Sequence, residues 1–281
     1  MSQPSPIPRV LSIAGTDPTG GAGIHADLKS IAANGGYGMA VVTALVAQNT
    51  QGVRSIHIPL LEFLREQLDS VSDDVQIDAV KIGMLGNSGI IETVADWLRR
   101  NPAAVVVLDP VMIATSGDRL LTSDAEAALR ELLHHASLIT PNMPELAVLA
   151  NAPEAGDWAG VLDQAHAVAS QYNTLVLAKG GHLKANHAPD ALVWPNGEVV
   201  EFAGARIDTR NTHGTGCSYS AALATLRPQK ANWPDAVAQA KTWLTDSIRH
   251  SDALHVGHGH GPISHFATLW AQTGVHPNTS N

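Results

Sequence analysis

Residues 206–226 of the chain read RIDTRNTHGTGCSYSAALATL. A polar run ends in the motif GTGC at 214–217, and an apolar segment follows directly, with Ala221, Ala222 and Leu226 at helical spacing. Two glycines that flank a threonine at a helix start leave several backbone N–H groups without an intrahelical partner. These donors and the positive end of the helix dipole favour an anion. The sequence therefore predicts a helix whose first turn binds a phosphoryl group.

Cys217 stands beside this predicted anion site. A thiol at a helix N-terminus has a lowered pKa, so Cys217 is the group best placed to take a proton or carry a negative charge. The same motif is also typical of a glycine-rich turn followed by a buried cysteine, since free cysteine is among the most buried residue types. The motif alone leaves both interpretations open.

Composition limits the possible partners and the compartment. The 281 residues carry a formal net charge of −9 and show no cluster of Lys and Arg, which argues against a nucleic-acid surface and favours a small-molecule partner. The single cysteine excludes an internal disulfide framework, as is usual in a reducing cytoplasm. The start MSQPSPIPRV has no apolar core of a signal peptide, and the chain has no run of 18 apolar residues. We expect a soluble, cytoplasmic protein without a membrane partner.

Short apolar runs and helical patterns alternate along the chain. The runs that predict buried strands are 10–14, 39–47, 78–84, 103–108, 138–140 and 174–178. Past Lys179, an Asn-Gly turn joins the runs 191–194 and 199–202 into a predicted hairpin, and two helices follow the GTGC motif. Regular alternation predicts a mostly parallel sheet covered on both faces. We therefore expect a single α/β domain of three-layer α/β/α architecture.

The carboxyl ends of the strands are where such a fold binds its ligands. Asp109 and Glu145 lie there and could hold Mg²⁺, which prefers oxygen ligands. Lys179 would act as a point charge on a phosphate. Both acidic residues are also typical of a turn or a helix cap. Together with the anion site, the carboxylate pair and the lysine indicate phosphoryl transfer, in which positioning and charge neutralisation supply most of the catalysis.

Two common nucleotide-binding designs are absent from the sequence. No GxxxxGK[ST] motif occurs, which excludes the P-loop design. The loop after the first strand, GTDPTGGAG at 15–23, does not have the GxGxxG spacing of a dinucleotide fold. A nucleotide would have to be held in another way.

Seven motifs follow one another along the chain: IAGTDPTGGAGIHADLK at 13–29, TALVAQNT at 43–50, KIGML at 81–85, LDPVM at 108–112, ITPNMPE at 139–145, KGGH at 179–182 and NTHGTGC at 211–217. Together they closely resemble the hydroxymethylpyrimidine/phosphomethylpyrimidine kinases of thiamine biosynthesis, which belong to the ribokinase superfamily. The resemblance extends from about residue 10 to 266 and implies a single ribokinase-like domain. It also implies ATP and Mg²⁺, and two successive phosphorylations of 4-amino-5-hydroxymethyl-2-methylpyrimidine.

The resemblance assigns roles to the matching positions. The catalytic residues it implies are Gly214, Thr215, Gly216, Cys217 and Lys179, with Lys179, His213 and Thr215 on the phosphates. The substrate-binding residues it implies are Gly15, Asp27, Gln48, Met84 and Val111. A glutamine amide has one donor and one acceptor face, which complement the edge of a 4-aminopyrimidine. Met84 and Val111 are also typical core residues, and Gln48 could only cap a strand.

Cys217 departs from the wider superfamily, in which most sugar kinases carry Asp at this position. The pyrimidine kinases resemble this chain in carrying Cys. A loose transition state needs little early proton removal, so a modest base is sufficient.

Several alternatives remain open at this point. A pyridoxal kinase of the same branch would act on a similar hydroxymethyl group, and a non-catalytic pyrimidine-binding protein would keep the fold. The tail HVGHGHGPISH carries His255, His258, His260 and His265, which indicates either a transition-metal site or a glycine-rich loop near the nucleotide. We expect a homodimer, the commonest assembly of such enzymes.

Overall fold

The computed structural model describes residues 6–112, 125–183 and 186–275 of the chain. Its central sheet has eight strands in the order β10-β9-β8-β7-β6-β5-β1-β2. The strands are β1 (Arg9–Ala14), β2 (Tyr37–Val42), β5 (Ala79–Ile82), β6 (Val105–Leu108), β7 (Leu138–Ile139), β8 (Leu175–Lys179), β9 (Asp190–Val193) and β10 (Val199–Phe202). Neighbours from β2 to β8 pair in parallel, whereas β9 and β10 continue the sheet antiparallel. This confirms the predicted α/β class and the predicted hairpin.

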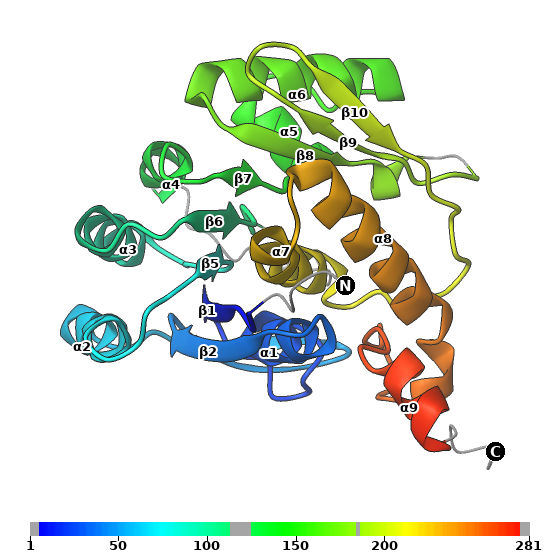
Figure 1. Ribbon diagram of the computed structural model, residues 1–281, viewed down its shortest axis with the longest axis horizontal. Helices are drawn as coiled ribbons and strands as arrows, with labels where there is room; N and C mark the ends of the chain where they lie inside the picture. The colour runs from blue at the N-terminus through cyan, green and yellow to red at the C-terminus, as the bar shows by residue number, and fades with distance from the viewer. Residues whose placement is uncertain (1–5, 113–124, 184–185, 276–281) are drawn as a thin grey trace.

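Helices cover both faces of the sheet (Figure 1). One face carries α2 (Leu61–Ser72), α3 (Ser88–Arg100), α4 (Ala125–Leu133), α5 (Met143–Leu149) and α6 (Trp158–Tyr172). The other face carries α1 (Gly23–Ala33), α7 (Thr215–Leu226) and α8 (Trp233–Arg249), and α9 (Ala267–Thr273) follows near the C-terminus. The predicted three-layer architecture is therefore confirmed.

Strand β6 shows why the buried strands read as unbroken apolar runs. All four of its residues are buried. Successive side chains of a strand point to opposite faces. Val106 and Leu108 accordingly pack in the core under α2 to α6, while Val105 and Val107 pack in the core under α7 and α8. A strand with a hydrophobic core on each side has no solvent face to mark with polar residues.

Helix α7 lies at the centre of its layer. Every residue from 218 to 226 is buried, and most of them are small. The Ser220 hydroxyl donates to the Gly216 carbonyl oxygen at 2.9 Å, and the Thr225 hydroxyl donates to that of Ala221 at 2.8 Å, so these two buried hydroxyls are satisfied inside the helix. A helix that is apolar on all sides belongs in the interior. The burial of α7 fixes the position of its N-terminus relative to the sheet.

The predicted strand 39–47 is divided in the structure. The chain turns after β2, at Thr43 and Ala44, and enters β3 (Leu45–Asn49), which pairs antiparallel with β4 (Gly52–His57) in a separate two-stranded sheet. The Thr43 hydroxyl donates to the Met84 carbonyl oxygen at 2.6 Å, and the Ala44 carbonyl oxygen accepts from the amide of Thr16 at 2.9 Å. Both contacts join distant parts of the chain, so the apolar pattern alone could not show the break.

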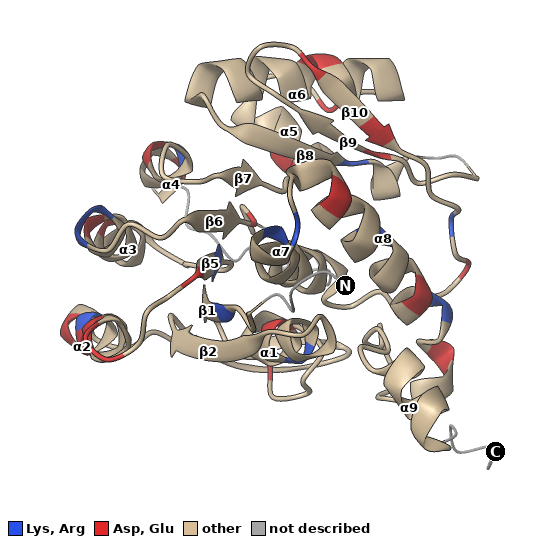
Figure 2. Ribbon diagram, viewed as in Figure 1, with Lys and Arg blue, Asp and Glu red and all other residues tan. Residues whose placement is uncertain are grey.

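Charged side chains lie mainly on the outer helices. In Figure 2, Lys and Arg are interspersed with Asp and Glu along α2 and α3. Arg100 of α3 pairs with Asp69 of α2 at 3.3 Å. Among the described residues, no helix has both the length and the apolar character needed to cross a membrane.

Candidate active site

The N-terminus of α7 has the backbone geometry that the predicted anion site requires. Gly214 precedes the helix with a φ of 76°, and a Cβ there would overlap a neighbouring carbonyl oxygen, so only glycine fits. The Thr215 hydroxyl donates to a backbone carbonyl oxygen of the preceding loop at 2.7 Å. In the described part of the chain, the amides of Gly216 and Cys217 have no protein acceptor. Two N–H groups at the positive end of a buried helix are therefore available to an anion.

Asp109 and Lys179, from the ends of β6 and β8, meet beside Gly216. Lys179 Nζ lies 3.2 Å from Asp109 Oδ1, which also accepts from the Thr140 hydroxyl at 2.8 Å. A Cβ on Gly216 would lie 3.3 Å from Asp109 Oδ2 and 3.5 Å from Lys179 Nζ, so the missing side chain lets the helix approach both groups. The pKa of Lys179 is raised. Burial alone would lower it, but the nearby carboxylates, mainly those of Asp109 and Glu145, together have the larger effect. A permanent cation therefore faces the anion site.

Glu145 has the capping role that the sequence left open. Its Oε2 accepts from the amide of Asn142 at 2.9 Å, and Asn142 Oδ1 accepts from the amide of Glu145 at 2.9 Å, which together form a capping box at the start of α5. Burial raises the pKa of Glu145 to about 7, and Asp109 adds to this rise, against the opposing effect of Lys179. Glu145 thus lies in the field of Asp109 and Lys179, and its role toward Mg²⁺ stays a prediction.

A small apolar cluster lies beside these charged groups, at the ends of β1, β5 and β6. Met84 packs there with Ala44 and Val46, and Val111 packs against them. A Cβ on Gly15 would lie 3.2 Å from Met84 Sδ, so glycine keeps the backbone close to this wall. The structure brings three predicted residues together and adds Val46, which the sequence interpretation missed because it lay inside a run taken for a core strand.

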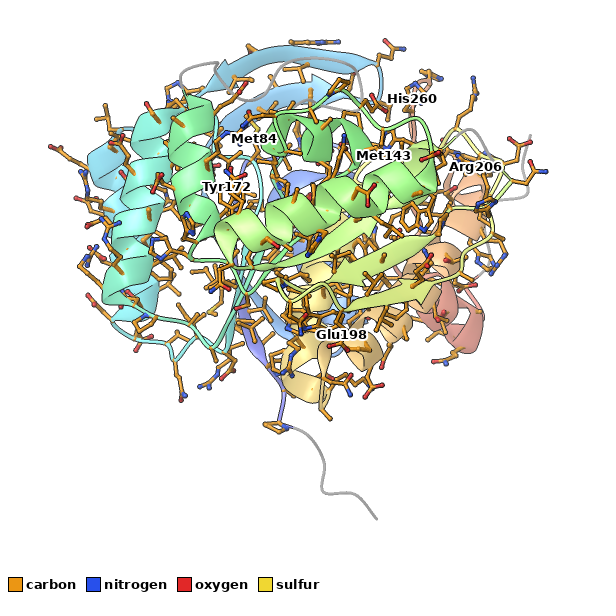
Figure 3. All side chains as sticks on the ribbon, turned by 90° about the horizontal axis from the view of Figure 1, so that it is seen from above. Met84, Met143, Tyr172, Glu198, Arg206 and His260 are labelled. Atoms are coloured by element: carbon orange, nitrogen blue, oxygen red, sulfur yellow. The ribbon has the colours of Figure 1, made fainter. Side chains whose placement is uncertain are left out.

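Gln48 lies on strand β3 of the two-stranded sheet, two residues after Val46 of the apolar cluster, and its contact with substrate stays a prediction. The pairing of β3 with β4 shifts register between Ala47 and Gln48, so a bulge sits at this residue. Bulges re-aim side chains and are frequent next to active sites. Gln48 is half-buried. From above, Met84 lies toward the side of the molecule that this sheet occupies (Figure 3).

Comparison with known proteins decides which family has this arrangement. The family described as phosphomethylpyrimidine kinase matches residues 17–264. The chain belongs to this family. A hydroxymethylpyrimidine/phosphomethylpyrimidine kinase of Escherichia coli (strain K12) is 52% identical over 261 residues, which cover 92% of this chain and 98% of that protein. The resemblance seen in the seven motifs is confirmed.

Longer relatives contain this family as a part. A thiamine biosynthesis multifunctional protein ThiED of Corynebacterium efficiens is 54% identical over 260 residues, which cover 92% of this chain but 35% of that protein. The chain thus spans about a third of the length of this relative.

Solved structures show the same fold. An ADP complex of Bacillus subtilis pyridoxal kinase has a TM-score of 0.86 at 32% identity and covers 94% of this chain and 99% of that one. A phosphomethylpyrimidine kinase from Clostridium difficile 630 has a TM-score of 0.73 at 34% identity and covers 86% of this chain and 99% of that one. The predicted ribokinase-like fold is confirmed.

Asp27 occupies a different environment from the one expected for a substrate ligand. Its carboxylate is fully buried and lies 2.8 and 2.9 Å from Lys81 Nζ, and the Ser12 hydroxyl donates to it at 2.6 Å. Burial alone would lower the pKa of Lys81, but Asp27, Cys217 and Asp109 together outweigh it and raise that pKa. The short contacts make Asp27 and Lys81 an ion pair, and Asp27 faces Lys81 and Ser12. A direct role of Asp27 toward substrate stays a prediction.

The expectation of a lowered thiol pKa at Cys217 is wrong for this structure. Burial raises the pKa of Cys217 to about 11, and the carboxylates of Asp27 and Asp109 add to the rise, whereas Lys81 opposes it. The helix N-terminus is present, but the surrounding carboxylates and the loss of water outweigh it. These same effects show that the thiol lies within electrostatic reach of both the Asp27–Lys81 pair and Asp109.

His213 is held by a residue that the sequence interpretation missed. Its Nε2 lies 2.8 Å from Oδ2 of the buried Asp17, so this nitrogen carries the proton. A Cβ on Gly21 would meet the His213 ring at 2.5 Å, so the two loops pack closely. Contact of His213 with phosphate stays a prediction. The aspartate in GTDPTGGAG was the available signal, since a buried carboxylate in a glycine-rich loop needs donors.

The C-terminal histidines occupy different environments. Among residues 6–112, 125–183 and 186–275, no group of three or more His, Cys, Asp or Glu could hold a metal ion. His265 is buried with Nε2 at 2.9 Å from the Ser218 hydroxyl, while His255, His258 and His260 are exposed. The prediction of a glycine-rich loop is the one that fits this segment.

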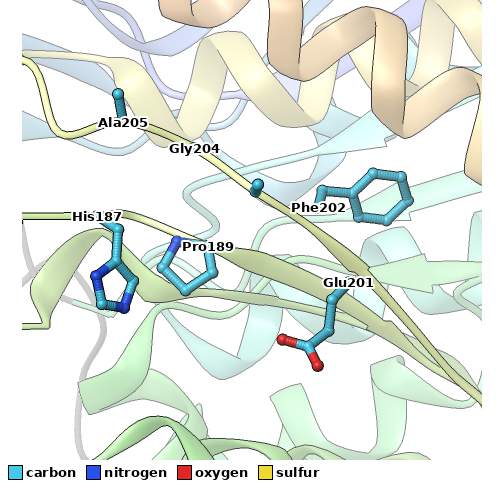
Figure 4. Close-up of a pocket in the computed structure, with 7 residues that line it drawn as sticks. His187, Pro189, Glu201, Phe202, Gly204 and Ala205 are labelled. Atoms are coloured by element: carbon cyan, nitrogen blue, oxygen red, sulfur yellow. The ribbon is translucent and has the colours of Figure 1, made fainter.

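A separate hollow lies on the β9–β10 hairpin (Figure 4). Its volume is about 720 Å³, and it is lined by His187, Pro189, Glu201, Phe202, Ala203, Gly204 and Ala205. Glu201 accepts from the Trp158 indole N–H at 2.7 Å. None of the predicted site residues lines this hollow. The candidate active site is therefore defined by the strand ends.

Proposed function

We propose that this protein transfers the γ-phosphoryl group of ATP to the hydroxymethyl oxygen of 4-amino-5-hydroxymethyl-2-methylpyrimidine, and then a second one to the resulting monophosphate. In each transfer the bond between the γ-phosphorus and the β,γ-bridging oxygen breaks, a bond from that phosphorus to the acceptor oxygen forms, and ADP leaves. In the first transfer the acceptor hydroxyl also releases its proton to solvent. The observation that carries the proposal is the anion site at Gly216 and Cys217, which lies beside Lys179 and Asp109 at the same sheet edge as the Met84 cluster. Relatives named for both phosphorylations support it.

The protein's own groups account for most of the catalysis in this proposal. The amides of Gly216 and Cys217 and the Lys179 ammonium hold the transferring phosphoryl group, whose charge is spread over its oxygens. Their positions are fixed by the buried helix α7 and by the Asp109–Lys179 contact of 3.2 Å. Because the donors are already oriented, little reorganisation accompanies the reaction.

The charged cluster also fits Mg²⁺. Asp109 and Glu145 offer carboxylate oxygens, the ligand type that Mg²⁺ prefers, and two protein ligands suffice because the ion keeps waters and phosphate oxygens. Bound there, Mg²⁺ would neutralise charge on the phosphates of ATP. The charge of a cation bound there would offset the burial that raises the pKa of Glu145 to about 7.

The apolar cluster would receive the pyrimidine ring. Met84, Val46 and Val111 form a wall for the flat ring, and Gly15 lets the backbone approach it. Gln48 would pair its amide with the 4-amino group and the adjacent ring nitrogen. In a loose transition state the hydroxyl proton leaves late, so a protonated Cys217 thiol is compatible with turnover.

The pyridoxal kinase and the non-catalytic alternatives are not favoured. The matching family and the Escherichia coli relative are both named for pyrimidine phosphorylation. The residues proposed to hold phosphate and metal are all present, and a protein that had lost catalysis would be expected to lack some of them.

Mass spectrometry of the reaction products tests the proposal. The purified protein is incubated with the pyrimidine alcohol, ATP and Mg²⁺, and we expect both the mono- and the diphosphate. Removal of Mg²⁺ with EDTA and the variant Lys179→Met should each suppress both products. Pyridoxal is assayed in parallel. Faster phosphorylation of pyridoxal than of the pyrimidine, or no product from either, would contradict the proposal.

We also propose that the protein is a cytoplasmic homodimer with a single catalytic domain. ATP is abundant inside cells, and the lone cysteine suits a reducing compartment. An apolar surface on β4 and α2 has Leu60 76% and Phe63 56% exposed, with Ile56 and Ile58 beside them. A second copy would cover it. Light scattering should give the mass of two chains, and Leu60→Lys with Phe63→Lys should give that of one.

A further inference from the structure

The C-terminal segment that carries the exposed histidines runs between two parts of the active site. We name residues 257–261 the strap. Toward the two-stranded sheet, the amide of Gly259 donates to Thr50 Oγ1 at 3.1 Å, and the amide of His260 donates to the Thr50 carbonyl oxygen at 2.9 Å. Toward the loop before α7, the amide of Gly261 donates to Asn211 Oδ1 at 3.0 Å. The strap is therefore hydrogen-bonded on both sides.

The alternating sequence GHGHG matches this double contact. A Cβ on Gly257 would overlap the Thr50 side chain, and one on Gly259 would overlap the Thr50 carbonyl oxygen. A Cβ on Gly261 would overlap Asn211 Oδ1. The three glycines thus line the inner side of the strap. His258 and His260, which alternate with these glycines, are exposed, so their side chains meet no such steric restriction.

The strap contacts both parts of the proposed active site, the one for the pyrimidine and the one for the phosphate. Thr50 lies in the turn between β3 and β4, two residues after Gln48, in the two-stranded sheet unit that would receive the pyrimidine. Asn211 leads through His213 into the anion site, and the amide of His213 donates to the Gly261 carbonyl oxygen at 3.0 Å. In Figure 3, His260 lies toward the same side of the molecule as Met84.

We propose that the strap couples the pyrimidine-binding sheet to the phosphate-binding loop, with Thr50 and Gly259 as positioning residues. The inference rests on the proposed function. A ligand on either side favours the strap geometry that the other side needs. Because such coupling is reciprocal, the nucleotide tightens pyrimidine binding by the same factor as the pyrimidine tightens nucleotide binding.

Calorimetry on the full chain tests the coupling. The dissociation constant of the pyrimidine alcohol is measured alone and with saturating AMP-PCP and Mg²⁺, a nucleotide that cannot transfer its terminal phosphoryl group. We expect the nucleotide to tighten binding about tenfold in the wild type. Thr50→Val removes the acceptor for the Gly259 amide without a change of shape, and the ratio should fall toward one. Thr50→Ser keeps the hydroxyl and should keep the ratio.

Glycine substitutions give an independent arm with a matched control. Gly259→Ala should abolish the coupling, while Gly156→Ala should not, because a Cβ at Gly156 meets nothing within 4 Å. If Gly259→Ala does not fold, the threonine pair decides. A wild type in which the nucleotide does not tighten pyrimidine binding, or a Thr50→Val variant in which it still does, would contradict the proposed coupling through the strap. Neither result touches the proposed function, which fails only if the wild type makes no phosphorylated pyrimidine.

Discussion

The Asp17 carboxylate and the His213 imidazole meet at 2.8 Å and tie the first glycine-rich loop to the anion site. Asp17 is buried, and its oxygens also accept from Thr19 and from the amides of Gly21 and Ala22. Burial alone would raise its pKa, but the hydrogen bonds from His213 and Thr19 outweigh it and lower the pKa to about 2. An ionised carboxylate with donors on both oxygens orients the imidazole next to Gly214.

Replacement of Asp17 by Asn should disturb both stability and catalysis. Whichever way the amide turns, its NH₂ group faces donors that the carboxylate had accepted. Unsatisfied buried donors of this kind cost about 2–4 kcal/mol in the free energy of unfolding, measured by urea denaturation. We also expect kcat to fall, because His213 and the loop before α7 lose their anchor. The exposed Asp163→Asn on α6 should change neither. Wild-type kcat in a folded Asp17→Asn variant would show that the link has no part in turnover.

The buried pair of Lys81 and Asp27 should be the costliest charge to disrupt. Both side chains are 0% exposed. Lys81→Met leaves an unpaired carboxylate in the interior, and we expect a loss of about 3–5 kcal/mol in the free energy of unfolding. Adding Asp27→Asn should recover part of that loss, which a double-mutant cycle measures. Arg99→Met, at a side chain 58% exposed, is the matched control. If Lys81→Met and Arg99→Met lowered the free energy of unfolding equally, the buried pair would not contribute the stability expected of it.

Cys217→Ala tests whether the thiol takes part in proton transfer. We expect kcat to fall on the order of 100-fold while pyrimidine binding changes little, since the ring wall and Gln48 remain. Because burial raises the pKa of the thiol to about 11, alkylation by iodoacetamide near neutral pH should be slow in the free protein. Near wild-type turnover in the variant would make the thiol a bystander and leave the amides of Gly216 and residue 217 as the working groups.

Gln48→Leu tests the assignment of the pyrimidine edge. The apolar side chain leaves the ring's amino group and nitrogen without partners, which should raise KM for the pyrimidine about 10–100-fold. The value of kcat at saturation should change less, because the anion site is untouched. Steady-state kinetics at several pyrimidine concentrations separates the two effects. A KM equal to that of the wild type would place the ring elsewhere.

The features that the sequence predicted correctly depend on local pattern. Unbroken apolar runs such as 105–108 arise because both faces of the sheet are buried, and the GTGC motif marks a helix start through its glycines. The strand-end residues Asp109 and Lys179 follow from the rule that parallel strands end at one edge. Each of these depends on neighbours in sequence, so periodicity and motif spacing were enough.

The features that the sequence did not predict depend on contacts between distant segments. Lys81 sits in an apolar strand, and only the fold brings Asp27 to it. The thiol pKa of Cys217 follows from burial and from carboxylates on other elements, which outweigh the helix end that the sequence shows. The sequence indicated a glycine-rich loop at GHGHG but not what it contacts, because Thr50, which packs against two of its glycines, lies far away in the chain.

His265 should make the stability of the protein depend on pH. Its Nε2 is buried at 2.9 Å from the Ser218 hydroxyl, and burial, with a smaller contribution from Lys29, lowers its pKa to about 3. In the unfolded chain the imidazole takes up a proton below about pH 6.5, while the folded protein does not. The unfolded state is therefore favoured as the pH falls, and this residue alone should lower the free energy of unfolding by about 2 kcal/mol between pH 7 and 5.

His265→Gln removes this titration and isolates its contribution. Urea denaturation at several pH values should give a shallower decline below pH 7 for the variant than for the wild type, whatever the change in stability at neutral pH. His258→Gln, at an exposed position of the strap, should keep the wild-type slope. An unchanged slope in His265→Gln would mean that the imidazole takes up its proton over the same pH range in the folded protein as in the unfolded chain. Because Ser218 directly follows Cys217, such a charge would then stand next to the anion site and strengthen it at low pH.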